Sequence, residues 1–315
     1  MEKRYFIGID LGGTNIAVAL CDEEGKILGR AKKKTLAPRP YNEIFDDMVD
    51  CAHIACDKAG IPLDKVESVG VGCPGSIDVE KGTIEYSNNL RFFDVPVVSY
   101  LEEKLHKKVY VENDANAAAW GEYLAGSGQG GDSLVMITLG TGVGGGIIID
   151  GKLIPGAFGK GAELGHMVIV VDGEECSCGR RGCLEAYASA TALIKQTKKA
   201  MLDNPHCDMW QIAEGNIDNV NGTTAFKGRD DVAKAVVDTY LNYVSEGVVD
   251  IVNLLQPTVV CIGGGISHEG ESILAPMKKA IKERSYARHS AKQTEVTLAT
   301  LGNDAGIIGA ALLGR

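Results

Sequence analysis

Four side chains that favour transition metals are concentrated in one short stretch of the sequence. Three cysteines, Cys176, Cys178 and Cys183, lie within eight residues of one another, and His166 precedes the first of them by ten residues. Thiolate and imidazole are the ligands that zinc prefers, and four of them complete a tetrahedral structural site. The spacing is less specific than two C-x-x-C pairs, and the alternative is three reduced cysteines and a surface histidine. We expect a structural zinc site, because the cluster is much denser than chance placement.

Two carboxylates, Glu163 and Glu185, flank this stretch. Glycines Gly179 and Gly182 lie between the cysteines and allow the backbone to turn tightly around an ion. A bound metal would therefore fix a loop and, through it, the direction of both acids.

A further acid, Asp114, follows the short apolar run 109–112 and precedes a run of alanines. The alanines predict a helix, so Asp114 lies at or near a helix N-terminus, where the helix dipole favours a carboxylate. Two interpretations remain open from this stretch alone. Asp114 is either only an N-cap or a general base held ionised at the mouth of a cleft.

Two glycine-rich turns each join a pair of apolar strands. The first turn, at 11–15, follows the strand 5–10, and the second, at 140–146, follows the strand 133–139. Backbone N–H groups and threonine hydroxyls in such turns suit phosphate oxygens, and Asp10 at the first strand's end could hold Mg²⁺ through water. The second turn matches G-x-G-x-x-G, but a β-branched run follows it instead of a helix, which argues against dinucleotide binding. The P-loop pattern G-x-x-x-x-G-K-[ST] does not occur, so that type of nucleotide site is excluded.

The remaining sequence alternates helical and extended patterns. A third glycine run, 263–265, follows a strand and permits close approach of a flat ring or ribose to the backbone. Residues 204–227 are polar and irregular, and the sequence assigns no role to them. The expected helices are 42–58, 190–202, 230–255, 271–283 and a last one ending near 313, and further strands are 27–35, 66–73, 259–262 and 295–300. Because strand, glycine turn and strand occur twice, we expect two α/β domains that face each other across a cleft.

Composition narrows the class of protein. A chain of 315 residues with 45% hydrophobic and 23% charged residues is typical of a soluble globular protein of two domains. No apolar run approaches the roughly 20 residues of a membrane-spanning helix, and the start has no signal-peptide pattern. Nine cysteines without secretory features indicate the reducing cytosol. The net charge of −10 disfavours nucleic acid as a partner.

Taken together, these stretches resemble the ROK sugar kinases of the actin, Hsp70 and hexokinase superfamily. The resemblance covers nearly the whole chain and is loosest at 204–227. The motifs that carry it are DLGGTN at 10–15, END at 112–114, LGTGVGGG at 139–146, GAELGH at 161–166, CSCGRRGCLE at 176–185 and GGGIS at 263–267. Within the family, YSNNL, ENDANAAA and AGIIGAAL are most similar to bacterial glucokinases of the Gram-positive type.

The resemblance implies an α/β fold of two actin/hexokinase-like (ribonuclease H-like) domains flanking a cleft. A small domain would comprise 1–114 plus about 301–315, and a large domain, 115–300, would carry the zinc loop. The implied reaction is ATP-dependent phosphorylation of a hexose, with glucose at its 6-hydroxyl as the first choice. Asp114 matches the family's catalytic base and would accept the hydroxyl proton during in-line attack on the γ-phosphorus.

The family's other functional positions map onto three groups of residues. The sugar-binding positions are Gly75, Asn88, Asn113, Asp114, Glu163, His166 and Glu185. The ATP and magnesium positions are Asp10, Gly12, Gly13, Thr14, Asn15, Thr141 and Gly142, with Gly264 and Gly265 on the adenosine side. The zinc ligands are His166, Cys176, Cys178 and Cys183, and this zinc would be structural and would orient the substrate loop without activating water.

Three alternatives remain beside the glucokinase prediction. One is a kinase for fructose, N-acetylmannosamine, N-acetylglucosamine or allose, since the hydrogen-bonding set is shared among them. The family also contains sugar-sensing repressors, but these carry a helix-turn-helix domain where this sequence begins its first strand, and a non-catalytic scaffold would need neither the zinc stretch nor Glu163. The family suggests a homodimer or homotetramer in the cytoplasm. The sequence does not identify the hexose, other phosphoryl donors or any allosteric regulation.

Overall fold

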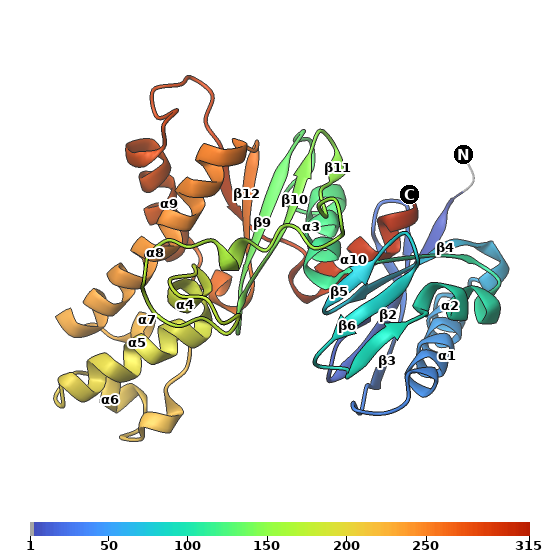
Figure 1. The fold of residues 1–315 in the computed structure, drawn as a ribbon, viewed down its shortest axis with the longest axis horizontal. Helices are drawn as coiled ribbons and strands as arrows, with labels where there is room; N and C mark the ends of the chain where they lie inside the picture. The colour runs from blue at the N-terminus through green and yellow to red at the C-terminus, as the bar shows by residue number, and fades with distance from the viewer. Residues whose placement is uncertain (1–2) are drawn as a thin grey trace. The chain divides into compact units, whose positions relative to one another are not determined.

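The computed structural model describes residues 3–315 and divides them into two compact units. The first unit contains the residues up to Gly131, Gly146–Ala162 and Thr300–Arg315, and the second contains Asp132–Gly145 and Glu163–Ala299. Strands and helices alternate along both units (Figure 1). The expected α/β class is therefore confirmed.

The first unit is built on a five-stranded sheet in the order β3-β2-β1-β4-β8. Strands β1, β2 and β3 form an antiparallel meander, whereas β4 and β8 continue the sheet parallel to β1. A separate antiparallel sheet contains β5, β6 and β7. The strands are β1 (Tyr5–Leu11), β2 (Asn15–Asp22), β3 (Ile27–Lys34), β4 (Val66–Cys73), β5 (Ser76–Asp78), β6 (Thr83–Ser87), β7 (Phe92–Val95) and β8 (Lys108–Asn113).

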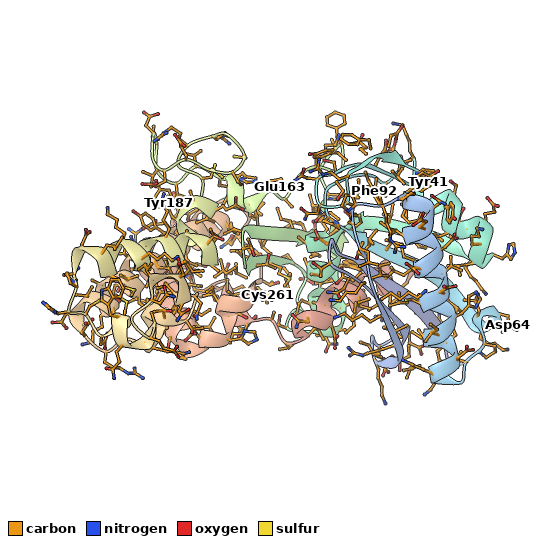
Figure 2. All side chains as sticks on the ribbon, turned by 90° about the horizontal axis from the view of Figure 1, so that it is seen from below. Tyr41, Asp64, Phe92, Glu163, Tyr187 and Cys261 are labelled. Atoms are coloured by element: carbon orange, nitrogen blue, oxygen red, sulfur yellow. The ribbon has the colours of Figure 1, made fainter. Side chains whose placement is uncertain are left out.

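Helices cover both faces of the main sheet, which explains why the apolar runs of β1 and β4 are almost completely buried. Helices α1 (Tyr41–Ala59) and α2 (Val97–Leu105) enclose one core, in which Phe45 and Phe92 meet edge to face with ring centroids 6.0 Å apart (Phe92 is labelled in Figure 2). Helices α3 (Asp114–Ala125) and α10 (Ala305–Ala311) lie on the other face, where Ile307 and Ile308 pack with Phe6.

The observed units differ from the expected domains in the position of α3. The expected boundary at residue 114 separates this helix from the N-terminal part, but α3 packs closely on α10 within the first unit. Gly309 permits this contact, since a Cβ there would lie 1.6 Å from the Ala117 carbonyl oxygen. The return of the C-terminal residues to the first unit, from Thr300 onward, resembles the expected arrangement.

The second unit repeats the same sheet plan. Its strand order is β11-β10-β9-β12-β13, with β12 parallel to both β9 and β13. The strands are β9 (Leu134–Leu139), β10 (Val143–Ile149), β11 (Lys152–Leu153), β12 (Val259–Gly263) and β13 (Glu295–Leu298). The end of β10, from Gly146, and all of β11 belong to the first unit. Because β10 follows the glycine turn, the exclusion of a dinucleotide-binding helix is confirmed.

The helices of the second unit are α4 (Glu185–Ala188), α5 (Ala190–Asp203), α6 (Met209–Ile212), α7 (Thr224–Lys227), α8 (Asp231–Leu255) and α9 (Glu271–Arg284). Short 3₁₀ turns complete the chain: η1 (Leu63–Lys65), η2 (Leu164–His166), η3 (Ile217–Asn219), η4 (Gly265–Glu269), η5 (Gly302–Asp304) and η6 (Leu312–Gly314). The irregular stretch 204–227 thus contains α6, η3 and α7. No helix within 3–315 is long and apolar enough to cross a membrane.

Candidate active site

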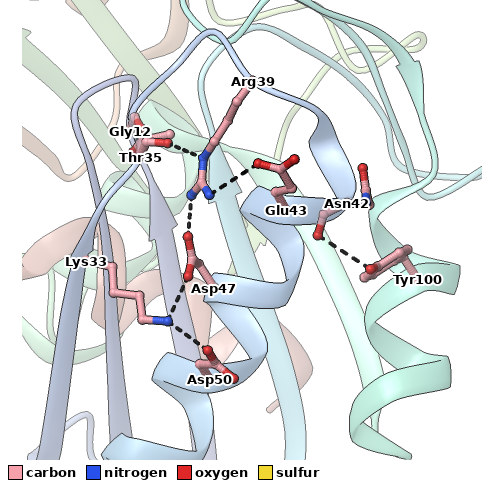
Figure 3. A network of polar contacts seen from close by, with 9 residues as sticks. All are labelled: Gly12, Lys33, Thr35, Arg39, Asn42, Glu43, Asp47, Asp50 and Tyr100. Atoms are coloured by element: carbon pink, nitrogen blue, oxygen red, sulfur yellow. Dashed lines mark hydrogen bonds and ion pairs between the residues drawn. The ribbon is translucent and has the colours of Figure 1, made fainter.

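The glycine turn between β1 and β2 has a firmly held backbone. The Gly12 N–H donates to the Asn15 carbonyl at 2.9 Å, and the Thr35 N–H donates to the Thr14 carbonyl at 3.0 Å. The Thr35 hydroxyl also donates to the Gly12 carbonyl at 2.6 Å (Figure 3). Both ends of the turn are therefore anchored to the segment that follows β3.

An ion-pair network connects that segment to α1 (Figure 3). Arg39 Nε donates to the Thr35 carbonyl at 2.7 Å, and the Arg39 guanidinium also pairs with Asp47. Lys33 Nζ lies 2.7 Å from carboxylate oxygens of both Asp47 and Asp50. Burial alone would raise the pKa of Asp47, but hydrogen bonds from Lys33 and Arg39 outweigh it and hold that pKa below its ordinary value. The network braces the turn through the first helix.

A cavity of about 810 Å³ opens beside this turn and is lined by residues of the first unit alone. Every predicted site residue of the turn lines it: Asp10, Gly12, Gly13, Thr14 and Asn15. The Asn15 Oδ1 atom is buried and has no hydrogen-bond partner within the described residues. A buried acceptor without a donor is uncommon in folded proteins, and here it is available to a ligand or to water that a metal ion carries.

Asp10 and Asp114 lie at the carboxyl ends of parallel strands in the first unit, since Asp10 belongs to β1 and Asp114 directly follows β8. Burial, and then the negative charge of Asp114, raise the pKa of Asp10 to about 6. Burial also raises the pKa of Asp114, although the Ala115 N–H donates to its carboxylate at 2.9 Å and opposes the shift. Two carboxylates that repel each other beside a cavity are suited to a divalent cation and to proton transfer.

The N-cap of α3 is Asn113 and not Asp114, so the capping interpretation of Asp114 is wrong by one residue. The Asn113 Oδ1 atom accepts from the N–H groups of Ala115 and Asn116 at 2.9 and 3.3 Å. Its Nδ2 donates to the Gly75 carbonyl at 3.2 Å. Because a neighbouring amide caps the helix, the carboxylate of Asp114 is not needed as the cap, although it accepts one hydrogen bond from the Ala115 N–H in the first turn of α3.

The other sugar-binding positions of the first unit lie around the small sheet. Gly75 has φ +113°, and a Cβ there would lie 2.1 Å from the Tyr86 carbonyl oxygen, so only glycine fits. Asn88 Oδ1 accepts from the Tyr86 hydroxyl at 3.3 Å. Asn89, the second asparagine of the YSNNL stretch, lies beside the first glycine turn, since a Cβ added to Gly13 would lie 3.2 Å from the Asn89 Cβ. This contact places the predicted sugar loop beside the first glycine turn, and only the fold reveals it.

The second unit brings the four predicted zinc ligands together. Their donor atoms all lie within 4.8 Å of one another. The Sγ atoms of Cys178 and Cys183 are 3.7 Å apart, and Cys176 Sγ lies 3.6 Å from His166 Nδ1. A disulfide would need about 2.05 Å, whereas ligands about 2.0–2.3 Å from a tetrahedral zinc are separated by roughly 3.3–3.8 Å. The donor set and its spacing therefore fit a structural zinc ion.

The loop that carries these ligands folds back on itself. Gly179 and Gly182 have φ +85° and +80°, the left-handed region expected of the glycines between the cysteines. The Gly182 N–H donates to the Glu174 carbonyl at 2.8 Å, and the Gly182 carbonyl accepts from Ile169 at 2.9 Å. Turns and short bridges, without longer secondary structure, hold the cluster in place.

Glu185 joins this loop to the second glycine turn. Its Oε2 accepts from the Val143 N–H at 3.0 Å, and its Oε1 accepts from the Ser177 hydroxyl at 2.7 Å. A Cβ on Gly142 would lie 2.4 Å from Glu185 Oε2, so a larger residue there would displace the Glu185 carboxylate. A cavity of about 420 Å³ is lined by Thr141, Gly142, Cys176, Ser177, Glu185 and five neighbours from α4 and α5, together with Glu175. The loop with the four candidate metal ligands and the second glycine turn are thus connected through Glu185.

The remaining predicted residues of the second unit are less constrained by their contacts. Glu163 immediately precedes η2 (it is labelled in Figure 2), and its carbonyl accepts from the His166 N–H at 3.0 Å, while its exposed carboxylate has no hydrogen bond within the described residues. Gly264 has φ +83° and lies against β9, where a Cβ would meet the Leu139 carbonyl oxygen at 2.5 Å. Nothing lies within 4 Å of a Cβ on Gly265. Of these two glycines, Gly265 is therefore the one with open space beside it for a ligand.

The structure distributes the predicted site residues between the two units. The first unit holds Asp10, Gly12, Gly13, Thr14, Asn15, Gly75, Asn88, Asn113 and Asp114. The second holds Thr141, Gly142, Glu163, His166, Cys176, Cys178, Cys183, Glu185, Gly264 and Gly265. Each set is locally consistent with the binding of phosphates and of a polar ligand.

Comparison with known proteins identifies the family. The ROK family model matches residues 6–315, and the chain belongs to the ROK family. It is 37% identical over 314 residues to a glucokinase of Streptomyces coelicolor, which covers 98% of this chain and 97% of that one. It is also 32% identical to a xylose repressor of Caldicellulosiruptor bescii, over 89% of this chain and 70% of the repressor.

Among solved structures, the chain is similar to a ROK family glucokinase from Streptomyces griseus in complex with glucose and AMPPNP. The two are 38% identical with a TM-score of 0.79, and the match covers 98% of each chain. This similarity supports the expected fold class of the sugar kinases.

Proposed function

We propose that this protein is an ATP-dependent hexose kinase, and that it is a glucokinase that forms glucose 6-phosphate. The observation that carries the proposal is Asp114, a half-buried carboxylate whose charge acts on Asp10 at the first glycine turn, in a chain of the ROK family. Full-length similarity to glucokinases, one of them solved with glucose and AMPPNP, supports the choice of substrate and donor.

Asp114 would act as the general base. Its raised pKa makes the carboxylate a better proton acceptor than an ordinary aspartate. It would accept the proton of the sugar hydroxyl while that oxygen attacks the γ-phosphorus in line. Because phosphoryl transfer requires mainly positioning and charge stabilisation, the base needs chiefly a fixed direction, and the hydrogen bond from the Ala115 N–H to the Asp114 carboxylate helps to supply it.

The two glycine turns would bind the phosphates through backbone N–H groups and the hydroxyls of Thr14 and Thr141. Gly264 and Gly265 would border the adenosine. A magnesium ion, when bound, would neutralise charge on the phosphates, and Asp10 is the side chain that would hold it through water.

The sugar would be held by acids and amides that accept and donate hydrogen bonds to its hydroxyls. In the first unit these are Gly75, Asn88 and Asn113, and in the second Glu163, His166 and Glu185. His166, Cys176, Cys178 and Cys183 would hold a structural zinc ion. Since Nδ1 of His166 faces Cys176 Sγ, the other ring nitrogen is left to donate to a sugar hydroxyl. We further propose a cytoplasmic homodimer or homotetramer without a nucleic-acid partner.

The test is an assay of ATP consumption over glucose, fructose, N-acetylmannosamine, N-acetylglucosamine and allose, with the wild type and Asp114→Asn. We expect kcat/KM to be highest for glucose, and kcat of Asp114→Asn to fall by about 10²–10⁴, with circular dichroism and Tm showing a folded variant. Turnover that survives the substitution would remove Asp114 as the base. Preference for another hexose would correct the substrate, and no turnover with any sugar would favour a regulator like the xylose repressor.

A further inference from the structure

Three residues on neighbouring strands of the first unit form one row across the main sheet. Asp10 of β1 pairs with Ala17 of β2, and Ala17 pairs with Lys32 of β3. Directly paired residues point to the same face of a sheet, so the carboxylate, the methyl group and the ammonium share one face. Asp10 and Lys32 are separated by two strand spacings, about 10 Å. Only the methyl group of Ala17 stands between them in this row.

The row borders the cavity that contains the first glycine turn. Asp10, Ala17 and Lys32 all line it, together with Thr14. The flexible four-carbon stem of a lysine gives its ammonium considerable reach. Because the residue between them is an alanine, no long side chain of this row separates Lys32 from Asp10.

The other cationic side chains near this row either form ion pairs, as Arg30 and Lys33 do, or come from outside the sheet, as Lys58 does. Arg30 lines the same cavity, but its guanidinium is held by both carboxylate oxygens of Asp304 at 2.7 and 2.5 Å. Lys33 is bound to Asp47 and Asp50. Lys58 borders the cavity from the last turn of α1. Within residues 3–315, the exposed ammonium of Lys32 makes no ion pair or side-chain hydrogen bond.

We propose that Lys32 binds the phosphate tail of the nucleoside triphosphate donor in this cavity. The inference rests on the proposed kinase function and adds a donor-binding residue to it. A triphosphate brings several negative charges to a cavity that already contains the carboxylate of Asp10, and backbone N–H groups supply only partial positive charges. A lysine acts as a point charge toward phosphate, and Lys32 lines the same cavity as the turn and has no ion-pair partner within the described residues.

The test compares Lys32→Met with Lys34→Met and Lys32→Arg. Lys34 is the matched control, because it is an exposed lysine two residues further along β3, on the same face, and outside the cavity lining. The measurements are kcat and KM for ATP and for glucose, and the inhibition constants of ADP and of adenosine. Thermal unfolding of each variant confirms the fold.

For Lys32→Met we expect kcat/KM for ATP to fall at least tenfold and inhibition by ADP to weaken by a similar factor. The KM for glucose and the inhibition constant of adenosine should stay within twofold, since neither involves phosphate. Lys32→Arg should recover most of the loss, and Lys34→Met should match the wild type. A change below twofold in kcat/KM for ATP would overturn the proposal. So would a weakening of inhibition by adenosine as large as that of inhibition by ADP. An inactive wild type would instead contradict the kinase function itself.

Discussion

The two units use one sheet plan for different tasks. In each, an antiparallel strand pair joined by a glycine turn is followed by two parallel strands, in the orders β3-β2-β1-β4-β8 and β11-β10-β9-β12-β13. The turns are also alike in their bonding, since Gly12 donates to the Asn15 carbonyl at 2.9 Å and Gly140 donates to the Gly142 carbonyl at 3.0 Å. What differs is the residue two positions before each turn's first glycine. Asp10 stands there in the first unit and Thr138 in the second.

This difference indicates that the two units have the same sheet arrangement but different functions. The first unit adds Asp114 at the start of the helix that follows β8, so its turn is bordered by two acids. The second unit has no acid in its turn and instead ties it, through Glu185, to a loop with four metal-binding side chains. The repeated sheet supplies the two glycine turns that we propose bind phosphate, and the segments attached to it supply the proposed base in one unit and the proposed metal-ordered loop in the other.

The largest effect that separates the units should come from removing the metal. Cys178→Ser deletes one of four ligands, and structural zinc contributes on the order of 10 kcal/mol to small sites of this type. We expect bound zinc to fall from one per chain to near zero and the KM for glucose to rise by about 10² or more. Metal analysis by mass spectrometry and steady-state kinetics measure the two quantities.

The control for this substitution is Cys207→Ser, a buried cysteine of the same unit outside the cluster. It should retain zinc and the wild-type KM for glucose. Urea unfolding followed through Trp120, which belongs to the first unit, should not change in Cys178→Ser, because the cluster lies in the other unit. A metal-free variant with normal kinetics would show that the loop needs no ion.

A second, smaller effect should follow from the two glycines that directly follow β12 in the second unit. Gly264→Ala forces a Cβ to within 2.5 Å of the Leu139 carbonyl oxygen at φ +83°. We expect a loss of about 3 kcal/mol in the free energy of unfolding of the second unit, from clash and backbone strain together. Urea unfolding followed by Trp210 fluorescence reports it.

Gly265→Ala is the matched control, since nothing lies within 4 Å of the added methyl group. It should unfold within about 0.5–1 kcal/mol of the wild type, and any effect should appear instead in the KM for ATP. Equal destabilisation by both substitutions would mean that the contact with β9 is not the reason why glycine is needed at position 264.

Local sequence patterns predicted most of the helices and strands, because the conformation of each depends mainly on residues that are close in sequence. The strand 66–73 and the helix beginning at Ala190 agree with β4 and α5. The β-branched residues after the second turn correctly predicted β10. Where local chemistry is sufficient, as for the four zinc-type ligands that the fold gathers within 4.8 Å, sequence spacing alone was informative.

The features that the sequence did not predict depend on contacts between distant residues. The helix at 114–125 belongs to the first unit because of its packing with α10, about 190 residues away along the chain. Asn113 and Asp114 are both good N-caps, and only the backbone decides between them. Lys32 lies in a basic run that is typical of a solvated surface, and its position opposite Asp10 follows from strand register, which no pattern at 32–34 reveals.

The smallest expected effect tests the residue that distinguishes the two turns. The folded pKa of Asp10 is about 6, above its ordinary value of 3.8, because burial disfavours the charged form. The folded state therefore holds this proton more tightly than the unfolded state, so the contribution of Asp10 to stability is fully present below about pH 4 and is lost as the pH rises through about 6. Above pH 6 the ionised carboxylate costs the first unit about 2–3 kcal/mol, at 1.36 kcal/mol per pKa unit.

Asp10→Asn removes this cost, so without nucleotide and magnesium the first unit should gain about 2 kcal/mol at pH 7.5 and little at pH 4. Activity should fall at the same time, because the proposed magnesium ligand is lost. The counterpart Thr138→Val carries no charge in either state and should show no such dependence on pH. Urea unfolding at the two pH values, followed by Trp120 fluorescence, distinguishes them. If Asp10→Asn destabilised the first unit at pH 7.5, the ionised carboxylate would stabilise the fold, and a functional role would no longer distinguish Asp10 from Thr138.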